Sequence, residues 1–290
     1  MRYRIGAMHI GQILDTAFEV FRDHSKTLLA ITAVVFGPYL ILYFGSAFSG
    51  VWPVFKIISA YKAGAWNTYR EHYWEYAIGL GVFTFLHMVF TVYTRGALAI
   101  AMASMYLNHP VSTSTSIRFM ASRWWPIPKT FFMMLPYYTW SSIGMIFVLF
   151  SIAMLGNGVT GNVLMFTIFI FVGTAMTLVS SIAYGRLCLA FNVVILEDLS
   201  GWKAIRRSVS LMGGSWWQGV VLYLARFVLG LVLVGAMRFI PSDYAIFMLG
   251  VFINILLLSF FIAASVVLYF STRSKRENFD IEYMAQYATA

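Results

Sequence analysis

Six long apolar stretches, joined by shorter polar segments, set the pattern of this chain. A helix needs about 17–25 predominantly apolar residues to cross the hydrocarbon core of a bilayer. We therefore predict an all-α, polytopic membrane bundle with six transmembrane helices. Their approximate ranges are 27–48, 77–94, 130–155, 163–185, 218–237 and 245–270. As one helix, the apolar run from Asn162 to Leu196 would be about 52 Å long, so we expect it to protrude, kink or tilt and to extend into the cytoplasmic interface.

The segment before the fifth span, "GWKAIRRSVSLMGGSWW", has the pattern of an amphipathic helix. Its apolar residues are spaced alternately three and four apart, which places them on one helical stripe. They are Trp202, Ile205, Val209, Met212 and Trp216. Lys203, Arg206 and Arg207 lie off this stripe, as in helices that lie in the membrane interface. We expect Ser200 to cap this helix and Gly213-Gly214 to form the bend after it.

Two other segments repeat this arrangement ahead of a span. "STSTSIRFMASRWWPIPKTFF" (112–132) combines an apolar stripe with Arg118 and Arg123, and "GQILDTAFEVFRDHSKTLL" (11–29) is similar. Tryptophan concentrates where a helix meets the membrane interface, so we interpret Trp124, Trp125, Trp216 and Trp217 as anchors. The sequence thus predicts one membrane domain over residues 1–290 with three amphipathic helices and a pseudo-threefold repeat. Its units cover about 9–107, 112–198 and 200–285.

Composition and charge support a membrane location. The chain is 60% hydrophobic and 11% charged, against about 25% charged residues in soluble domains. Of its 20 Lys and Arg, Lys56, Lys62, Arg70 and Arg238 lie on one side of the predicted bundle, Arg226 lies within the fifth span, and the other fifteen lie opposite. Because cytoplasmic loops carry the excess of Lys and Arg, we predict that both termini are cytoplasmic. The net charge of +9 then indicates anionic lipid headgroups, not nucleic acid, as the partner.

Three stretches resemble a known family: "IGQILDTAFEVFRDH", "VVILEDLSGWKAIRRSVSLMGGSWW" and "VLYFSTRSKRENFDIE". They are similar to the membrane domain that occurs alone in bacteria or fused to glycerophosphodiester phosphodiesterases. The resemblance implies a bacterial cytoplasmic membrane protein of this fold, and it implies no activity for the domain itself. The fused phosphodiesterase is a barrel of about 250 residues, and no soluble stretch of that length occurs here.

Candidate chemistry is sparse along the chain. The five histidines have no metal-ligand spacing, and no catalytic motif is present, so we predict neither a metal site, a cofactor nor an enzyme. Glu71, His72 and Glu75 cluster in the first outer loop, where a solvated polar face is the simpler interpretation. Cys188 is interpreted as a buried small hydrophobe.

Two groups of polar residues remain as candidate sites. Arg226 and His87 lie within predicted spans, where polar side chains are costly and often functional. A buried pair or a snorkelling arginine is nevertheless the simpler explanation of Arg226, and a hydrogen-bonded core position is the simpler explanation of His87. Arg95 and Arg186 recur at matching repeat positions. Together with Lys203, Arg206 and Arg207 they form the candidate set for binding lipid headgroups.

These features lead to a hypothesis of a non-catalytic inner-membrane protein. It would act as a lipid-contacting scaffold or as the membrane subunit of a larger assembly, with a protein partner or further copies of itself as possible associates. The alternative is a transporter or channel with a path near Arg226 and His87. An enzyme acting on lipid comes third, because no catalytic constellation is visible.

Overall fold

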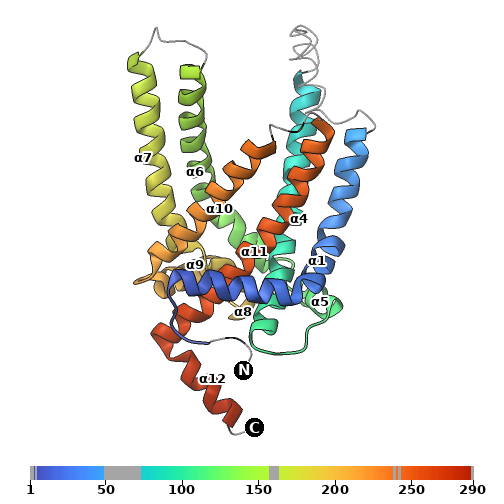
Figure 1. Ribbon diagram of the computed structural model, residues 1–290, viewed down its shortest axis with the longest axis vertical. Helices are drawn as coiled ribbons and strands as arrows, with labels where there is room; N and C mark the ends of the chain where they lie inside the picture. The colour runs from blue at the N-terminus through green and yellow to red at the C-terminus, as the bar shows by residue number, and fades with distance from the viewer. Residues whose placement is uncertain are drawn as a thin grey trace.

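The chain folds into long helices, and the described residues contain no strand. The computed structural model describes residues 3, 5–48, 73–156, 163–237, 240 and 243–288 and is 87% helical (Figure 1). The helices are α1 (Ile10–Phe48), α4 (Tyr73–Tyr106), α5 (Thr113–Ser122), α6 (Pro126–Gly156), α7 (Val163–Leu187), α8 (Ala190–Leu196), α9 (Trp202–Met212), α10 (Trp216–Met237), α11 (Asp243–Glu277) and α12 (Phe279–Ala288).

Four helices are long and apolar enough to cross a membrane. The candidate spans are Ile10–Ser46, Ala77–Tyr106, Leu249–Glu277 and Met165–Leu196, the last of which runs from α7 into α8. The other two predicted spans, 130–155 and 218–237, are helical as well and form most of α6 and α10. The acidic and histidine cluster predicted at 71–75 and the loop cations Lys56, Lys62, Arg70 and Arg238 lie outside the residues whose side chains are described.

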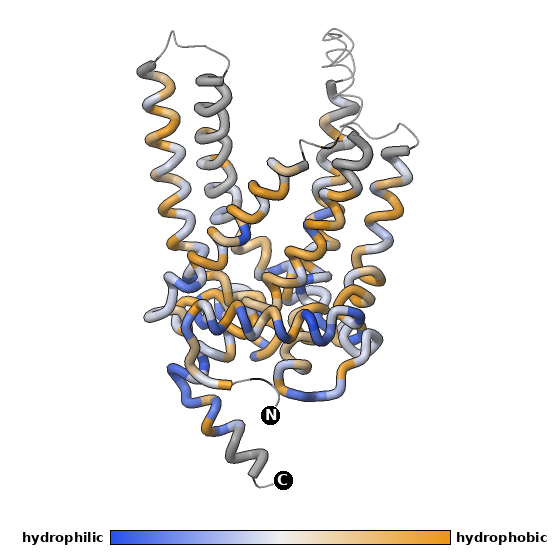
Figure 2. Tube along the Cα trace, viewed as in Figure 1, coloured by the Kyte–Doolittle hydropathy of each residue, from blue (hydrophilic) through white to orange (hydrophobic). Residues whose placement is uncertain are grey.

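The long helices converge at one end of the molecule. α1, α4 and α11 pack together, α6 packs along α7, and α10 leans across to contact both α7 and α11. The described ends of the chain lie at the same end of the molecule as α8 and α9 (Figure 1). Most of the buried core is also there, in residues 97–106 of α4, 189–195 around α8 and 262–270 of α11. Farther along the helices, orange apolar positions dominate (Figure 2).

The apolar run that is too long for one span is broken. α7 ends at Leu187 and α8 begins at Ala190, so the final apolar turns form a separate short helix. Five of the first six residues of α8 are at most 3% exposed, and Phe191 is 8% exposed. These turns are therefore part of the core at this end of the molecule and do not prolong the span.

Three helical segments precede the long ones where amphipathic helices were predicted. α1 bends at His24 (φ −119°, ψ 17°), so residues before the bend run across the foot of the bundle (Figure 1). α5 begins with a capping box in which the Ser112 side chain accepts a hydrogen bond from the backbone N–H of Thr115. α9 begins at Trp202 and is followed by the turn at Gly213-Gly214.

One detail predicted for α9 is wrong, and its protein-facing side coincides only in part with the predicted apolar stripe. Its N-cap is Gly201 and makes no side-chain capping bond, so Ser200 does not have that role. The buried face consists of Ala204, Ile205, Ser208, Leu211 and Met212, whereas Trp202 is 49% exposed and Val209 is 37% exposed. Small residues allow α9 to pack closely on the core, which turns the predicted stripe partly outward.

Candidate functional site

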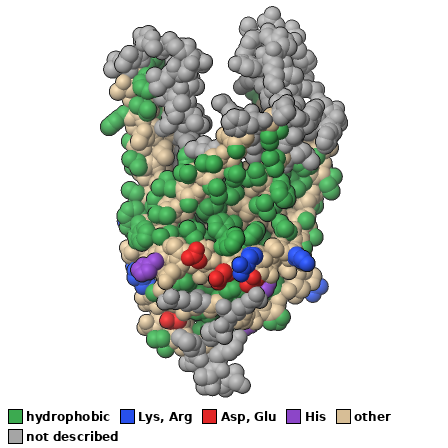
Figure 3. Space-filling view, in the orientation of Figure 1, with side chains coloured by type: hydrophobic (Ala, Val, Ile, Leu, Met, Phe, Trp, Pro, Cys, Tyr) green, Lys and Arg blue, Asp and Glu red, His purple; other side chains and the backbone are tan. Residues whose placement is uncertain are grey.

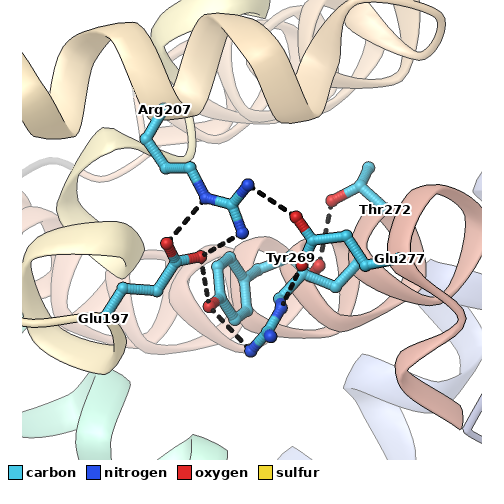
Figure 4. A network of polar contacts seen from close by, with 6 residues as sticks. Glu197, Arg207, Tyr269, Thr272 and Glu277 are labelled. Atoms are coloured by element: carbon cyan, nitrogen blue, oxygen red, sulfur yellow. Dashed lines mark hydrogen bonds and ion pairs between the residues drawn. The ribbon is translucent and has the colours of Figure 1, made fainter. Parts of the chain in front are cut away.

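A network of ion pairs joins α9 to the end of α11. Arg207 donates from Nε to Glu197 Oε2 (2.6 Å) and from Nη1 to Glu277 Oε1 (2.5 Å), as Figure 4 shows. The Tyr269 hydroxyl donates to Glu197 Oε1 (2.8 Å), and Arg273 Nε pairs with Glu277 Oε2 (3.0 Å). We call these five residues the Arg207 network. It brings together side chains from the α8–α9 turn, α9 and α11.

The Arg207 network is only partly accessible to solvent, which strengthens its interactions. The exposed fraction is 26% for the Arg207 side chain and 14% for the Glu197 side chain. Hydrogen bonds to Glu277 and Glu197 raise the pKa of Arg207 above its usual value. Two carboxylates thus bind the Arg207 guanidinium, and these ion pairs favour a structural role for Arg207 over headgroup binding. Glu197 pairs with Arg207 and not with Arg206, and it does not cap α9.

A second set of contacts fixes the α8–α9 turn to α5 and α6. Arg123, directly after α5, forms an ion pair with Asp198 and donates to the carbonyl oxygen of Val194 (Nη1–O 3.2 Å). The Gly201 backbone N–H donates to Thr130 Oγ1 on α6 (2.8 Å). The turn is therefore tied to α5 and α6 as well as to α11.

Two of the predicted arginines line the same pocket. Arg95 of α4 and Arg226 of α10 face a space of about 70 Å³ that is also lined by α7, α8 and α11. The other polar side chains on its wall belong to Tyr184, Asn192, Tyr223 and Ser265. Their common location was not visible in the sequence, because Arg95 and Arg226 had been assigned to different groups.

His87 lies elsewhere, between α1 and α4. Its ring makes edge contacts with Phe36 (centroids 5.7 Å apart) and Tyr39 (5.4 Å). It is not among the residues that line the pocket of Arg95 and Arg226. The structure therefore does not unite the two residues that were predicted to border a transport path.

The remaining candidate residues lie toward the surface. Arg186, Lys203 and Arg206 are exposed, and the Arg206 guanidinium lies 5.8 Å from the centre of the Trp202 ring. Trp124, Trp125 and Trp217 are 62%, 56% and 44% exposed, while Trp216 is half-buried. These cations and aromatic rings are placed where they can contact a membrane surface.

Arg95 and Arg186 differ because the order of two residues is reversed. Arg95 precedes Gly96, whereas Arg186 follows Gly185. Each glycine faces a close neighbour: a Cβ on Gly96 would lie 2.2 Å from Met120 Sδ, and one on Gly185 would lie 2.5 Å from the Trp216 carbonyl oxygen. Successive helical residues are rotated by about 100°. The two arginines therefore project to opposite sides of their glycines, Arg95 toward the pocket and Arg186 outward.

Comparison with known proteins adds no relative. No family model, no curated protein and no solved structure matches this chain. The similarity of its three motifs to the phosphodiesterase-associated membrane domain stays a prediction from the sequence.

Sequence reasoning missed several residues at this end of the molecule. Tyr269, Arg273 and Glu277 lie near the end of the last span and were interpreted only as span and tail. The spacing of Arg273 and Glu277 by four residues is a signal of a helical ion pair. Asn192, within an apolar run, was the other available signal: its amide donates to the Ser265 carbonyl oxygen (2.8 Å).

Proposed function

We propose that this protein is a non-catalytic, multi-pass inner-membrane protein that contacts anionic lipids and acts as a scaffold or as the membrane subunit of an assembly. The observation that carries the proposal is the arrangement of its surface. Hydrophobic side chains cover the middle of the face in Figure 3, and charged side chains gather in a band below them. This arrangement of an apolar zone next to a charged zone is typical of a protein that crosses a bilayer and contacts the lipid headgroups.

In this proposal six helices cross the membrane and three lie at its cytoplasmic surface. The spans would be the upper part of α1, with α4, α6, α7, α10 and α11. The residues of α1 before His24, together with α5 and α9, would be the interfacial helices, and both termini would be cytoplasmic. Exposed tryptophans at the starts of α6 and α10 support this placement, because tryptophan favours the interface.

An apolar groove beside the tryptophan pair of the second repeat also supports lipid contact. It has a volume of about 170 Å³ and is lined by residues of α4 and α6 together with Trp124 and Trp125. The Tyr93 hydroxyl donates to the Trp124 carbonyl oxygen (2.9 Å), which fixes the turn at its edge. An acyl chain has the shape and polarity to fill such a groove.

Selective lipid contact can be measured on the reconstituted protein. The relative association of spin-labelled phosphatidylglycerol and phosphatidylcholine would be compared for the wild type and the double variant Lys203→Gln/Arg206→Gln. Each cation near an anionic surface contributes about 1 kcal/mol, so the preference for phosphatidylglycerol should fall by up to about thirtyfold. The charge-preserving variant Lys203→Arg/Arg206→Lys is the control and should keep the preference.

Two outcomes would contradict the proposal. The first is a wild-type protein with no preference between the two lipids. The second is a flux of ions or solute through proteoliposomes that Arg226→Leu abolishes, because a conducting path would place the protein among transporters or channels.

A further inference from the structure

The pocket between α4, α7, α8, α10 and α11 has the character of an anion site. Two of its lining residues are arginines, Arg95 and Arg226, and none of the described residues that line it is Asp or Glu. Arginine remains protonated in proteins. The wall of the pocket thus carries two positive charges, and no carboxylate reaches it.

One arginine atom in this region lacks a partner. Arg95 Nε is buried and makes no hydrogen bond to any described residue. Leaving a buried charged donor unsatisfied is costly, and an oxyanion bound by the same guanidinium would stabilise its charge. Two guanidiniums near one space also repel each other, and an anion placed between them would be attracted to both.

Close packing holds the helices around Arg226 in place. α10 crosses α7 in close contact: a Cβ on Gly219 would lie 2.6 Å from the Gly185 carbonyl oxygen, and one on Gly185 would lie 2.7 Å from Val220 Cγ2. Arg226 is two turns beyond Gly219, so this crossing fixes its distance from α7. The bond from Asn192 to the Ser265 carbonyl oxygen joins α8 to α11 at the wall of the pocket.

The size and lining of the pocket select the ligand chemistry. A space of about 70 Å³ has room for about five water molecules, which is sufficient for one small oxyanion. Guanidinium groups bind phosphate oxygens in pairs through their planar donors. Besides these arginines and the polar side chains, the wall contains apolar residues, among them Phe191, Leu222 and Phe261. Such surroundings suit a phosphate that is attached to an apolar molecule.

We propose that Arg95 and Arg226 form an internal binding site for a phosphate group, supplied by a lipid headgroup or by free phosphate. This inference rests on the proposed function, since it names the chemistry that one site of a lipid-contacting protein would recognise. The surface cations Lys203 and Arg206 are not part of the site.

The test measures ligand-induced stabilisation of the full-length protein in a non-ionic detergent. The probes are inorganic phosphate and dihexanoyl-phosphatidylglycerol, with dihexanoyl-glycerol as the uncharged comparison. We expect a phosphate-containing probe to raise the melting temperature of the wild type. Arg95→Gln and Arg226→Gln should each weaken its apparent affinity at least about tenfold, because each removes a charge-assisted hydrogen-bonding group. Lys275→Gln, which removes an exposed cation in the last turn of α11, should have no effect.

The outcomes distinguish a lipid phosphate from free phosphate as the ligand, and some of them would contradict the proposed site. Stabilisation by dihexanoyl-phosphatidylglycerol alone would identify a lipid phosphate, and stabilisation by inorganic phosphate as well would identify a site for the free anion. Equal stabilisation by dihexanoyl-glycerol, no stabilisation of the wild type by either phosphate probe, or an equal loss in Lys275→Gln would overturn the proposal.

Arg226→Lys keeps the charge and serves if a glutamine variant does not fold. Lysine lacks the planar guanidinium group. The affinity of Arg226→Lys for the phosphate probe should therefore lie between that of the wild type and that of a variant without the charge. Undiminished affinity in both Arg226→Lys and Arg95→Lys would reject the paired-guanidinium site. If the phosphate probes fail to stabilise the protein but the lipid preference in the Lys203 and Arg206 experiment is intact, the internal site is rejected and the proposed function stands.

Discussion

At the scale of single residues, one left-handed position lies near the end of each of the three predicted repeat units. Asn108, Asp198 and Asn278 have φ values of 59°, 57° and 54°, and they are the only non-glycine residues with positive φ in the described part of the chain. They follow α4, α8 and α11, respectively. Asn and Asp tolerate this conformation better than other residues with a Cβ. This shared ending supports the repeat more directly than the apolar pattern does.

The first of these endings can be tested at Asn108. The Asn108 N–H donates to the Met105 carbonyl oxygen (3.1 Å) and the His109 N–H to the Ser104 carbonyl oxygen (2.8 Å), which is the Schellman arrangement. We predict that Asn108→Val lowers the free energy of unfolding by about 1–2 kcal/mol, since a Cβ-branched residue resists positive φ. Asn108→Gly is the matched control and should be as stable as the wild type. Thermal or denaturant unfolding in detergent provides the measurement, and equal stability of both variants would refute this explanation.

At the scale of helices, the apolar pattern predicted positions well and contacts poorly. All six predicted spans are helical, and the segments near 10–24, 113–122 and 202–212 are helices as expected. The break at Cys188-Leu189 and the outward position of Trp202 were not predictable in the same way. Hydropathy does not tell whether an apolar residue faces lipid or protein, because both environments accept it. The partners of Arg207 and the residues that share a pocket with Arg95 come from helices far apart in sequence, so local spacing could not identify them.

The Arg207 network provides the prediction at this scale. Glu197→Gln would replace the charged acceptor of Arg207 and Tyr269, and hydrogen bonds to charged groups contribute about 1.5–3 kcal/mol. We expect Glu197→Gln to lower the free energy of unfolding by that order and to loosen the contact of α9 with α11. Hydrogen exchange of α9 and the unfolding midpoint would report both effects. Arg206→Gln is the control, since Arg206 is exposed on the same helix. A loss of stability in Arg206→Gln as large as in Glu197→Gln would contradict the assigned role of the network.

At the scale of the whole molecule, one end is closely packed, and the helices beyond it expose large apolar side chains. The buried residues concentrate at the end where α8, α9 and the described chain ends lie, while large apolar side chains such as Ile41, Trp74 and Phe171 are more than 70% exposed elsewhere. Exposed apolar surface of this extent is stable only when something apolar covers it. A bilayer around the long helices would provide that cover and would leave the packed end at its surface. The membrane placement therefore follows from where the core is, as well as from helix length.

This placement predicts the sides on which two residues of neighbouring segments lie. Trp74 begins α4 and Ser114 lies on α5, so α4 alone separates them, and both are exposed. In a Cys188→Ala background, which removes the one cysteine of the sequence, Trp74→Cys should react with a membrane-impermeant maleimide in intact cells. Ser114→Cys should react only in inverted vesicles, because the excess of Lys and Arg predicts that α5 lies on the cytoplasmic side of the membrane. The reverse labelling pattern would show that the protein has the opposite orientation and that α4 still crosses the membrane. Labelling of both from the same side would mean that α4 does not cross the membrane, and the six-span topology would then be wrong.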